Sequence, residues 1–444
     1  MSLRLIATFL GLLALVCEAG GQSANDAGPP PIRSGVSPAD AYRGVYRFDD
    51  GHLVAIEHAL EGKEPHFVDF ATGRFGALYA ETETRFVAGP GMLIREPVEI
   101  RVTFQAGALR WQEEGQAARR ARRLKLREEE VRFSNGEVEL AGTLIRPLGK
   151  GPFPAIVLTQ TSNDAPRDAY RKEAGFFAAK GFAALVYDKR GVGRSTGDWR
   201  LATMRDLAED ASAAVERLRK TEGIDSTRIG IWGHSQGGWI GPLAASINSR
   251  VAFVIAQSAP TVTPAEQEIF RVEHNLRADG FPPEQIDDAV RYQKLLMRWV
   301  LEGAGRDELL IAIREAEKAQ WAEYVALPAD PLPDQPRETT RIFYSYDPRP
   351  ALRALRCPVL FLFGDRDSFV PVERSLEELR AILSEPGHRD QTIQVLRDTA
   401  HGMWETRFDG RKYFPKARRY GDRYWQKLAA WLESQARRSA PAYR

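Results

Sequence analysis

The chain has 444 residues, of which 43% are hydrophobic and 27% are charged, so it is long enough for two domains and a large core. This composition is that of an ordinary globular protein and excludes disordered, collagen-like and polytopic membrane proteins. The 62 lysine and arginine residues nearly balance the 60 aspartate and glutamate residues, and a chain without a broad basic field is not expected to bind nucleic acid.

The first 21 residues have the pattern of a secretory signal peptide. Arg4 precedes the apolar run Leu5–Val16, and the small residues Ala19–Gly21 follow it as a cleavage region. The apolar run is too short to span a bilayer comfortably, so no membrane span is expected in the mature chain. Residues 22–40 are rich in glycine, proline and polar residues and are expected to form a flexible spacer.

Cysteine usage agrees with export. Cys17 offers a lipoprotein site, but Val16 before it is bulkier than the small residue such a site resembles, which argues against lipidation. Once Cys17 leaves with the signal peptide, Cys357 is the one remaining thiol and has no partner for an internal disulfide. We therefore expect a periplasmic or extracellular protein.

Residues 41–127 are expected to form a small β-rich domain. Apolar and polar residues alternate in short runs that are separated by turns such as Asp49–Gly51 and Gln105–Gly107. Such spacing predicts a small antiparallel sheet or barrel. Its histidines at positions 52, 58 and 66 lack the spacing of a single helix face, so core or solvated histidines explain them better than a metal site. The sequence does not indicate which partner this domain would bind.

Residues 128–437 change to an α/β pattern. A hairpin across Val131–Arg146 turns at Asn135-Gly136, and short apolar strands then alternate with helices, which predicts a mostly parallel sheet with helices on both faces. The expected strands are Ala155–Leu158, Ala183–Tyr187, Arg228–Trp232, Val251–Ala256, Val359–Phe363 and Thr392–Leu396. The expected helices are Asp168–Lys180, Met204–Lys220 with a Thr203 cap that Asp206 reciprocates, Trp239–Ile247, Val372–Leu383 and Ala417–Ala436.

A helical segment at about residues 260–346 interrupts this alternation and contains no expected strand. Helical apolar spacing runs through Pro264–Ala278, Pro283–Leu301 and Arg306–Val325. An insertion of this length is expected to form a cap over the carboxyl edge of the sheet, where ligands bind. The alternative is a helical decoration away from the site.

The motif Gly233-His234-Ser235-Gln236-Gly237 follows the apolar run Ile229–Trp232 and precedes a helix. A strand, Gly-x-Ser-x-Gly and a helix together predict a nucleophile elbow, in which a tight turn presents the serine and only small neighbours fit beside it. Ser235 is therefore the candidate nucleophile.

A serine hydroxyl needs a base to remove its proton, and in this architecture the base follows the last strands. His388 precedes the last strand and should face the opposite edge of the sheet. His401 follows that strand and should lie on the same edge as Ser235, so it is the candidate base.

The carboxylate that orients the histidine is sought in the loop after the strand Val359–Phe363. Asp365 follows the strand immediately and is open to use by the turn, whereas Asp367 reaches further over the edge and is our candidate. Asp398 is expected to make a loop hydrogen bond.

The oxyanion formed by attack on a carbonyl needs two donors already in position. The backbone amide of Gln236, at the start of the helix, is the first candidate. The second is expected from the loop after Leu158, as the backbone amide of Thr161 or Ser162.

These motifs resemble the α/β-hydrolase superfamily, and in particular bacterial exported esterases similar to the serine aminopeptidase and dienelactone hydrolase branches. The resemblance covers about Val131–Gln435. It is carried by the run Tyr187–Ser195, the elbow with Gly238, the run Gly364–Asp367 with Val370-Pro371, and Ala400-His401-Gly402. It implies an α/β-hydrolase fold and a triad of Ser235, Asp367 and His401.

Two further features bear on the resemblance. Relatives often carry glycines in the oxyanion loop where this chain has Thr159–Asn163, which leaves the second donor open. The Asp188–Ser195 segment is expected to brace the active-site loops rather than react.

The resulting hypothesis is an exported carboxylic-ester hydrolase that works through an acyl-serine intermediate on a small-molecule acyl ester, with no metal and no organic cofactor. A peptidase or acyltransferase would use the same triad. A hypothesis of another class is a cell-wall or polysaccharide binding protein with a non-catalytic hydrolase scaffold. The acidic cap residues Glu266, Glu268 and Glu273 leave recognition of an N-terminal amine open, and the aromatic residues Phe270, Trp299 and Trp321 could line an acyl pocket or simply pack the cap.

Overall fold

A computed structural model describes residues 41–57, 64–328, 332–334, 338–388, 390–406 and 416–436 of the chain. The expected signal peptide, the spacer, Cys17 and His58 lie outside these residues. Among the helices that the structure describes, none combines the length and the apolar character needed to cross a bilayer.

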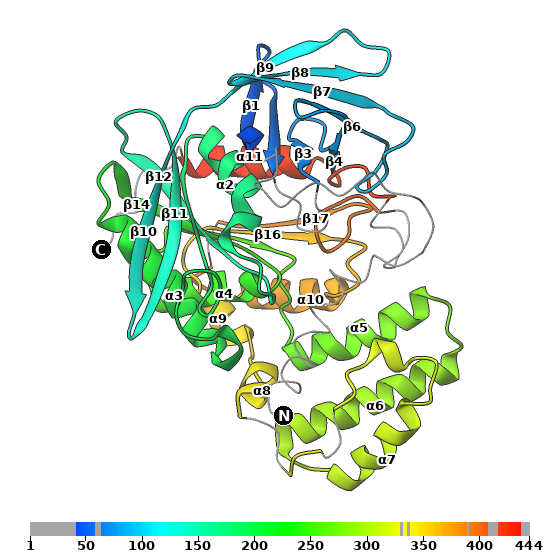
Figure 1. The fold of residues 1–444 in the computed structure, drawn as a ribbon. Helices are drawn as coiled ribbons and strands as arrows, with labels where there is room; N and C mark the ends of the chain where they lie inside the picture. The colour runs from blue at the N-terminus through cyan, green and yellow to red at the C-terminus, as the bar shows by residue number, and fades with distance from the viewer. Residues whose placement is uncertain are drawn as a thin grey trace.

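The amino-terminal part of the described chain folds into one antiparallel sheet of nine strands (Figure 1). The strands are β1 Gly44–Phe48, β2 Leu53–Glu57, β3 His66–Asp69, β4 Phe75–Ala77, β5 Tyr79–Ala80, β6 Arg85–Ala88, β7 Ile100–Gln105, β8 Ala108–Glu113 and β9 Arg119–Arg123. Their order, β4-β3-β2-β1-β9-β8-β7-β6-β5, begins and ends with strands that only Leu78 separates in the chain. The sheet therefore curls on itself around an apolar interior, and the prediction of a β-rich domain is confirmed.

The histidines of this sheet have structural partners. His52 Nε2 lies 2.6 Å from an Asp69 oxygen, and His66 Nδ1 lies 3.1 Å from the Glu64 carbonyl oxygen. Burial lowers the pKa of His66 to about 4, so this histidine is neutral in the folded protein at neutral pH.

A mixed sheet of eight strands forms the centre of the rest of the chain, with the order β10-β11-β13-β12-β14-β15-β16-β17. The strands β10 (Leu126–Asn135) and β11 (Val138–Pro147) form an antiparallel hairpin, and β11 also pairs with β13 in the antiparallel direction. All other neighbouring strands of the sheet pair in parallel. The parallel strands are β12 Phe153–Thr159, β13 Ala183–Tyr187, β14 Ile224–His234, β15 Phe253–Gln257, β16 Val359–Gly364 and β17 Gln391–Leu396. The predicted hairpin turn is confirmed, because Asn135 pairs with Val138 and Gly136 has a φ of 57°.

Helices cover both faces of this sheet (Figure 1). Apolar residues of α3 (Met204–Arg219), α4 (Gln236–Ile247), α9 (Arg349–Ala354) and α10 (Val372–Leu383) form the core of one face. Residues of α2 (Arg171–Ala179) and α11 (Tyr424–Ala436) form the core of the other, together with residues of the amino-terminal sheet. The two domains meet there through aromatic packing, in which Phe70 and Trp425 form an edge-to-face pair with 4.6 Å between the ring centroids. The predicted α/β-hydrolase fold is confirmed.

Three predicted helix boundaries are wrong. The helix predicted from Asp168 starts with a 3-10 turn, Arg167–Tyr170, before α2 begins. The helix predicted over Arg306–Val325 ends at Ala316 as α7, and a 3-10 turn follows at Ala322–Tyr324, because the chain turns back to bury Tyr324 in the cap core. The helix predicted from Ala417 begins only at Tyr424.

The late start of the last helix has a clear cause. Before it, the chain runs along the amino-terminal sheet: Phe75 N–H donates to the Arg418 carbonyl oxygen, and Met92 N–H donates to the Ala417 carbonyl oxygen. Asp422 and Arg423 then adopt positive φ values of 33° and 57°, which α-helical backbone does not allow.

The cap consists of the helices α5 Pro264–Ala278, α6 Pro283–Glu302, α7 Arg306–Ala316 and α8 Glu338–Tyr344 (Figure 1). It has its own apolar core. The predicted absence of strands from this segment holds for its described residues. The short helix α8 was not predicted.

Candidate active site

The nucleophile candidate Ser235 lies in the turn between β14 and α4. Its backbone has a φ of 57° and a ψ of −115°, a strained conformation for a non-glycine residue. A Cβ on Gly233 would lie 2.0 Å from the Gly237 carbonyl oxygen, and one on Gly237 would lie 2.7 Å from Thr159 Oγ1. The glycines are therefore required by close packing of the turn against itself and β12.

The base candidate His401 and the acid candidate Asp367 are hydrogen-bonded, with 2.8 Å between His401 Nδ1 and Asp367 Oδ2. Asp367 is buried, and its other carboxylate oxygen accepts hydrogen bonds from the backbone N–H groups of Phe369 (2.8 Å) and Val370 (3.0 Å). These two backbone donors therefore fix the orientation of the Asp367 carboxylate. Because Asp367 occupies Nδ1, Nε2 is the histidine nitrogen left to exchange a proton.

The competing polar residues have other contacts. Asp365 accepts a hydrogen bond from the Thr399 N–H at 3.1 Å, and the exposed carboxylate of Asp398 lies near Arg366 and Arg397 at 3.8 and 3.5 Å. His388 lies before β17, at the amino end of that strand.

Several contacts hold the His401 loop beside the elbow. The His401 carbonyl oxygen accepts a hydrogen bond from Ser258 Oγ at 2.7 Å and lies 3.1 Å from His234 Nε2. The backbone N–H of Ser235 donates to the Gln257 carbonyl oxygen at 2.9 Å. Burial, with repulsion from His401, lowers the pKa of His234 to about 3, so His234 is a neutral neighbour in the folded protein.

The three candidate oxyanion donors are placed differently. The N–H of Gln236 begins α4 and so has no partner within the helix. The N–H of Thr161 donates to Tyr170 Oη at 3.0 Å and is therefore already engaged. Ser162 lines the same small pocket as Ser235 and Gln236, and its N–H forms no hydrogen bond within the part of the chain that the structure describes.

Contacts around the Asp188–Ser195 segment agree with a bracing role. The Asp188 carboxylate accepts hydrogen bonds from the N–H groups of Arg167 and Arg194 at 2.9 and 3.0 Å. Arg190 forms a bidentate pair with Asp210 at 2.7 and 2.6 Å. Two residues that contact the oxyanion loop, Tyr170 and Lys189, were not singled out from the sequence.

Cap residues close the space above Ser235. Its pocket holds a free volume of about 10 Å³, room for about one water molecule, and is lined by Ser162, Ser235, Gln236, Trp239, Pro264, Gln267, Glu268 and Phe343. Of the aromatic residues considered from the sequence, Trp299 and Trp321 are buried in the cap core, and Phe270 lies against His274. The aromatic residues that line the pocket are instead Trp239 and Phe343.

The three cap glutamates have separate roles. Glu266 completes the capping box of α5 with Thr263, and Glu273 pairs with Arg277 at 2.6 Å on the surface. Glu268 lines the Ser235 pocket, but Arg271 holds its carboxylate with two hydrogen bonds of 2.9 and 2.7 Å. The one cap carboxylate of these three that is near the nucleophile is therefore neutralised.

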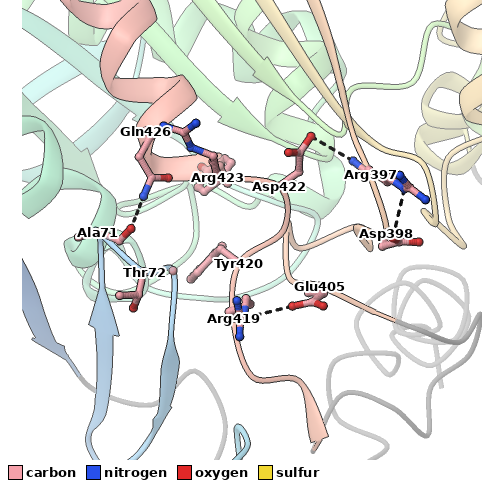
Figure 2. Close-up of a pocket in the computed structure, with 12 residues that line it drawn as sticks. Ala71, Thr72, Arg397, Asp398, Glu405, Arg419, Tyr420, Asp422, Arg423 and Gln426 are labelled. Atoms are coloured by element: carbon pink, nitrogen blue, oxygen red, sulfur yellow. Dashed lines mark hydrogen bonds and ion pairs between the residues drawn. The ribbon is translucent and has the colours of Figure 1, made fainter. Parts of the chain in front are cut away.

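A larger, open cavity of about 650 Å³ lies elsewhere, between the turn Ala71–Gly73 and the segments 397–405 and 419–426. Figure 2 shows ion pairs among its charged side chains, Arg419 with Glu405 at 3.3 Å and Arg397 with Asp398 at 3.5 Å. Of the three candidate catalytic residues, Ser235 lines the smaller pocket and none lines this cavity, so we place the chemistry in the smaller pocket.

Similar proteins are known both by sequence and by solved structure. Residues 135–384, more than half of the chain, match the model of the X-Pro dipeptidyl-peptidase (S15) family. The quorum-quenching protein AidA of Acinetobacter baumannii is 28% identical over 252 residues, which cover 56% of this chain and 81% of AidA. Esterase EstD of Thermotoga maritima is 26% identical over 274 residues, covering 60% of this chain and 58% of EstD, so less than two thirds of that relative is spanned. A solved Pyrococcus furiosus esterase gives a TM-score of 0.45 at 16% identity, over 70% of this chain and 91% of that one.

Proposed function

The chain belongs to the X-Pro dipeptidyl-peptidase (S15) family of the α/β-hydrolase superfamily, and from this premise we propose that it is a serine hydrolase that cleaves carboxylic esters through an acyl-serine intermediate. The observation that carries the proposal is the hydrogen-bonded pair of His401 and Asp367, held by backbone contacts beside the strained turn of Ser235. The resemblance to α/β-hydrolases drawn from the sequence motifs is confirmed by the family match.

The proposed mechanism uses only side chains and amides of this site. His401 Nε2 takes the proton of Ser235 Oγ as the oxygen attacks the ester carbonyl, and Asp367 stabilises the imidazolium that forms. The N–H groups of Gln236 and Ser162 hold the oxyanion. His401 then protonates the leaving alcohol. In the second half, a water gives its proton to His401 and attacks the acyl carbonyl, which releases the acid and restores Ser235.

The pocket favours a neutral acyl group over a substrate with a free amine. An ammonium group needs an unpaired carboxylate, and Arg271 already holds Glu268 on both oxygens. Arg271 in turn donates to the Tyr324 carbonyl oxygen at 2.8 Å, which fixes the pair in the cap core. Breaking such a buried pair would leave an uncompensated charge, at a cost of about 3 to 5 kcal/mol.

A peptidase is the second candidate, because the family takes its description from X-Pro dipeptidyl-peptidases. A panel of p-nitrophenyl esters of increasing acyl length, run beside aminoacyl and X-Pro p-nitroanilides, separates the two. We expect ester hydrolysis that Ser235→Ala abolishes, with little cleavage of the anilides. Cleavage of amides alone, with every ester inert, would reverse this assignment.

We also propose that the enzyme works in the periplasm or outside the cell, on the ground of the signal-peptide pattern in residues 1–21. Expression of the full chain, followed by fractionation and amino-terminal sequencing, tests this. Mature protein that starts near Gly21 or Ala24 in the exported fraction is the expected result, and uncleaved protein retained in the cytoplasm would contradict it.

A further inference from the structure

Lys189 is a buried lysine at the edge of the candidate active site. It follows β13 and is only 1% exposed. Its ammonium nitrogen lies 3.6 Å from the centroid of the Trp199 ring and forms no ion pair with a carboxylate of the described residues. Burial lowers the pKa of Lys189 well below its ordinary value. Burying an amino group without a carboxylate partner is costly unless other groups accept its hydrogen bonds, so its contacts are informative.

The contacts of Lys189 join the two segments that carry the candidate oxyanion donors. Nζ donates to the Thr161 carbonyl oxygen at 2.6 Å, in the loop after β12. It also lies 3.5 Å from Gln236 Oε1, on the first residue of α4. Lys189 thus bridges the oxyanion loop and the residue that follows the nucleophile.

The contact with Thr161 acts directly on a candidate donor. The carbonyl of Thr161 and the N–H of Ser162 belong to the same peptide unit, which is planar and trans, so the two groups point in opposite directions. A hydrogen bond that fixes the carbonyl therefore also fixes the direction of the N–H. Electrostatic polarisation of the carbonyl by the lysine strengthens the same N–H as a donor.

Other contacts hold the rest of this loop. Gln160 Nε2 donates to the Tyr187 carbonyl oxygen at 2.5 Å, and the Thr161 N–H donates to Tyr170. At the far end, Trp199 Nε1 donates to the Asp164 carboxylate at 2.7 Å. These bonds anchor both sides of the Thr161–Ser162 peptide and leave its orientation to Lys189.

We propose that Lys189 is a positioning residue that orients the Thr161–Ser162 peptide so that the Ser162 N–H serves as the second oxyanion donor. The inference rests on the proposed serine-hydrolase function and names a determinant of transition-state binding at that site.

The test compares Lys189→Met and Lys189→Gln with the full-length wild type. Methionine keeps an unbranched side chain against Trp199 but removes the donor, whereas glutamine keeps an N–H donor. For p-nitrophenyl butyrate we expect kcat to fall about 10- to 100-fold in Lys189→Met, less than the full loss of a direct donor, with KM changed little. Lys189→Gln should lie between the wild type and Lys189→Met.

A second measurement separates positioning from stability. n-Butylboronic acid forms a tetrahedral adduct with an active serine and uses the same donors, so its inhibition constant should rise by about the factor by which kcat/KM falls. The exposed Lys180→Met is the matched control and should leave both values unchanged, with thermal melts recorded for every variant.

Kinetics and boronate affinity within twofold of wild type in a folded Lys189→Met would overturn the inference, as would a loss of melting temperature alone. If Lys189→Met does not fold, Lys189→Gln gives the same comparison, and equality with wild type overturns it. Absence of any turnover by the wild type is instead a failure of the proposed function, and the inference falls with it.

Discussion

The substitution Asp367→Asn tests the histidine–carboxylate pair most sharply, because it changes one atom of a buried contact. The asparagine oxygen can keep the hydrogen bonds from the N–H groups of Phe369 and Val370. Its amide nitrogen then faces His401 Nδ1, where the carboxylate oxygen lies at 2.8 Å in the wild type. The amide donor would force His401 into the tautomer with the proton on Nε2, which is unable to accept the Ser235 proton.

The expected loss is large. A wrong histidine tautomer with otherwise intact geometry lowers kcat about 10⁴-fold in serine proteases, and each tenfold step is about 1.4 kcal/mol of activation free energy. For this chain we expect kcat to fall by about 10³ to 10⁴, or about 4 to 5.5 kcal/mol. The melting temperature should change little, since the asparagine has nearly the same shape.

The assay is stopped-flow hydrolysis of p-nitrophenyl acetate, which resolves the acylation burst from steady turnover. Asp365→Asn is the matched control, because it makes the same chemical change two residues away, where the side chain supports the Thr399 N–H. It should retain kcat within about threefold of wild type. A loss in Asp365→Asn as large as in Asp367→Asn, or a kcat of Asp367→Asn within tenfold of wild type, would refute the reasoning.

Three further predictions concern the scaffold. Gly233→Ala should destabilise the fold by about 3 kcal/mol or more and abolish activity, because its Cβ would lie 2.0 Å from the Gly237 carbonyl oxygen. A variant that stays active and is as stable as the wild type in denaturant titration would contradict this packing of the elbow. Burial raises the pKa of Glu57 to about 8 from 4.5, so the folded state retains a proton that the unfolded chain loses, and stability should fall as pH rises from about 4.5 to about 8, by on the order of 5 kcal/mol. Glu57→Gln should flatten that fall in urea melts at pH 5 and pH 8, and an unchanged slope would show that the carboxyl is not the cause. Thr203→Ala removes the capping box of α3 and should lower the free energy of unfolding by about 1 kcal/mol in the same melts, without changing kcat. An unchanged free energy of unfolding would show that water replaces the hydrogen bond of the cap.

Much of the α/β domain was predictable because its signals are local. The capping box of Thr203 and Asp206 and the helix Val372–Leu383 appear as expected, since the start of each depends on neighbours within one turn. Boundaries failed where distant contacts decide. The last helix starts at Tyr424 instead of Ala417 because the preceding residues pair with the amino-terminal sheet, far away in the sequence.

The placement of the candidate site residues was predictable to a similar degree. Strand order alone puts Asp367 and His401 on the edge that carries Ser235, because the ends of parallel strands share one edge. The partner of the Thr161 N–H was not predictable, since Tyr170 reaches it only through the fold of the loop between them. The Asp188–Ser195 segment was expected to brace the active-site loops, but Lys189 was not singled out within it, because a lysine in a glycine-rich turn is usually exposed and only the tertiary structure places it under the oxyanion loop.

The central claim is that Ser235 is a nucleophile activated by His401, and covalent labelling tests it most directly. A fluorophosphonate probe, followed by peptide mass spectrometry, should place one adduct on Ser235 in the wild-type protein, with labelling absent in Ser235→Ala and strongly slowed in His401→Ala. Folded wild-type protein that takes up no probe, or an adduct on another residue that persists in Ser235→Ala, would contradict the account.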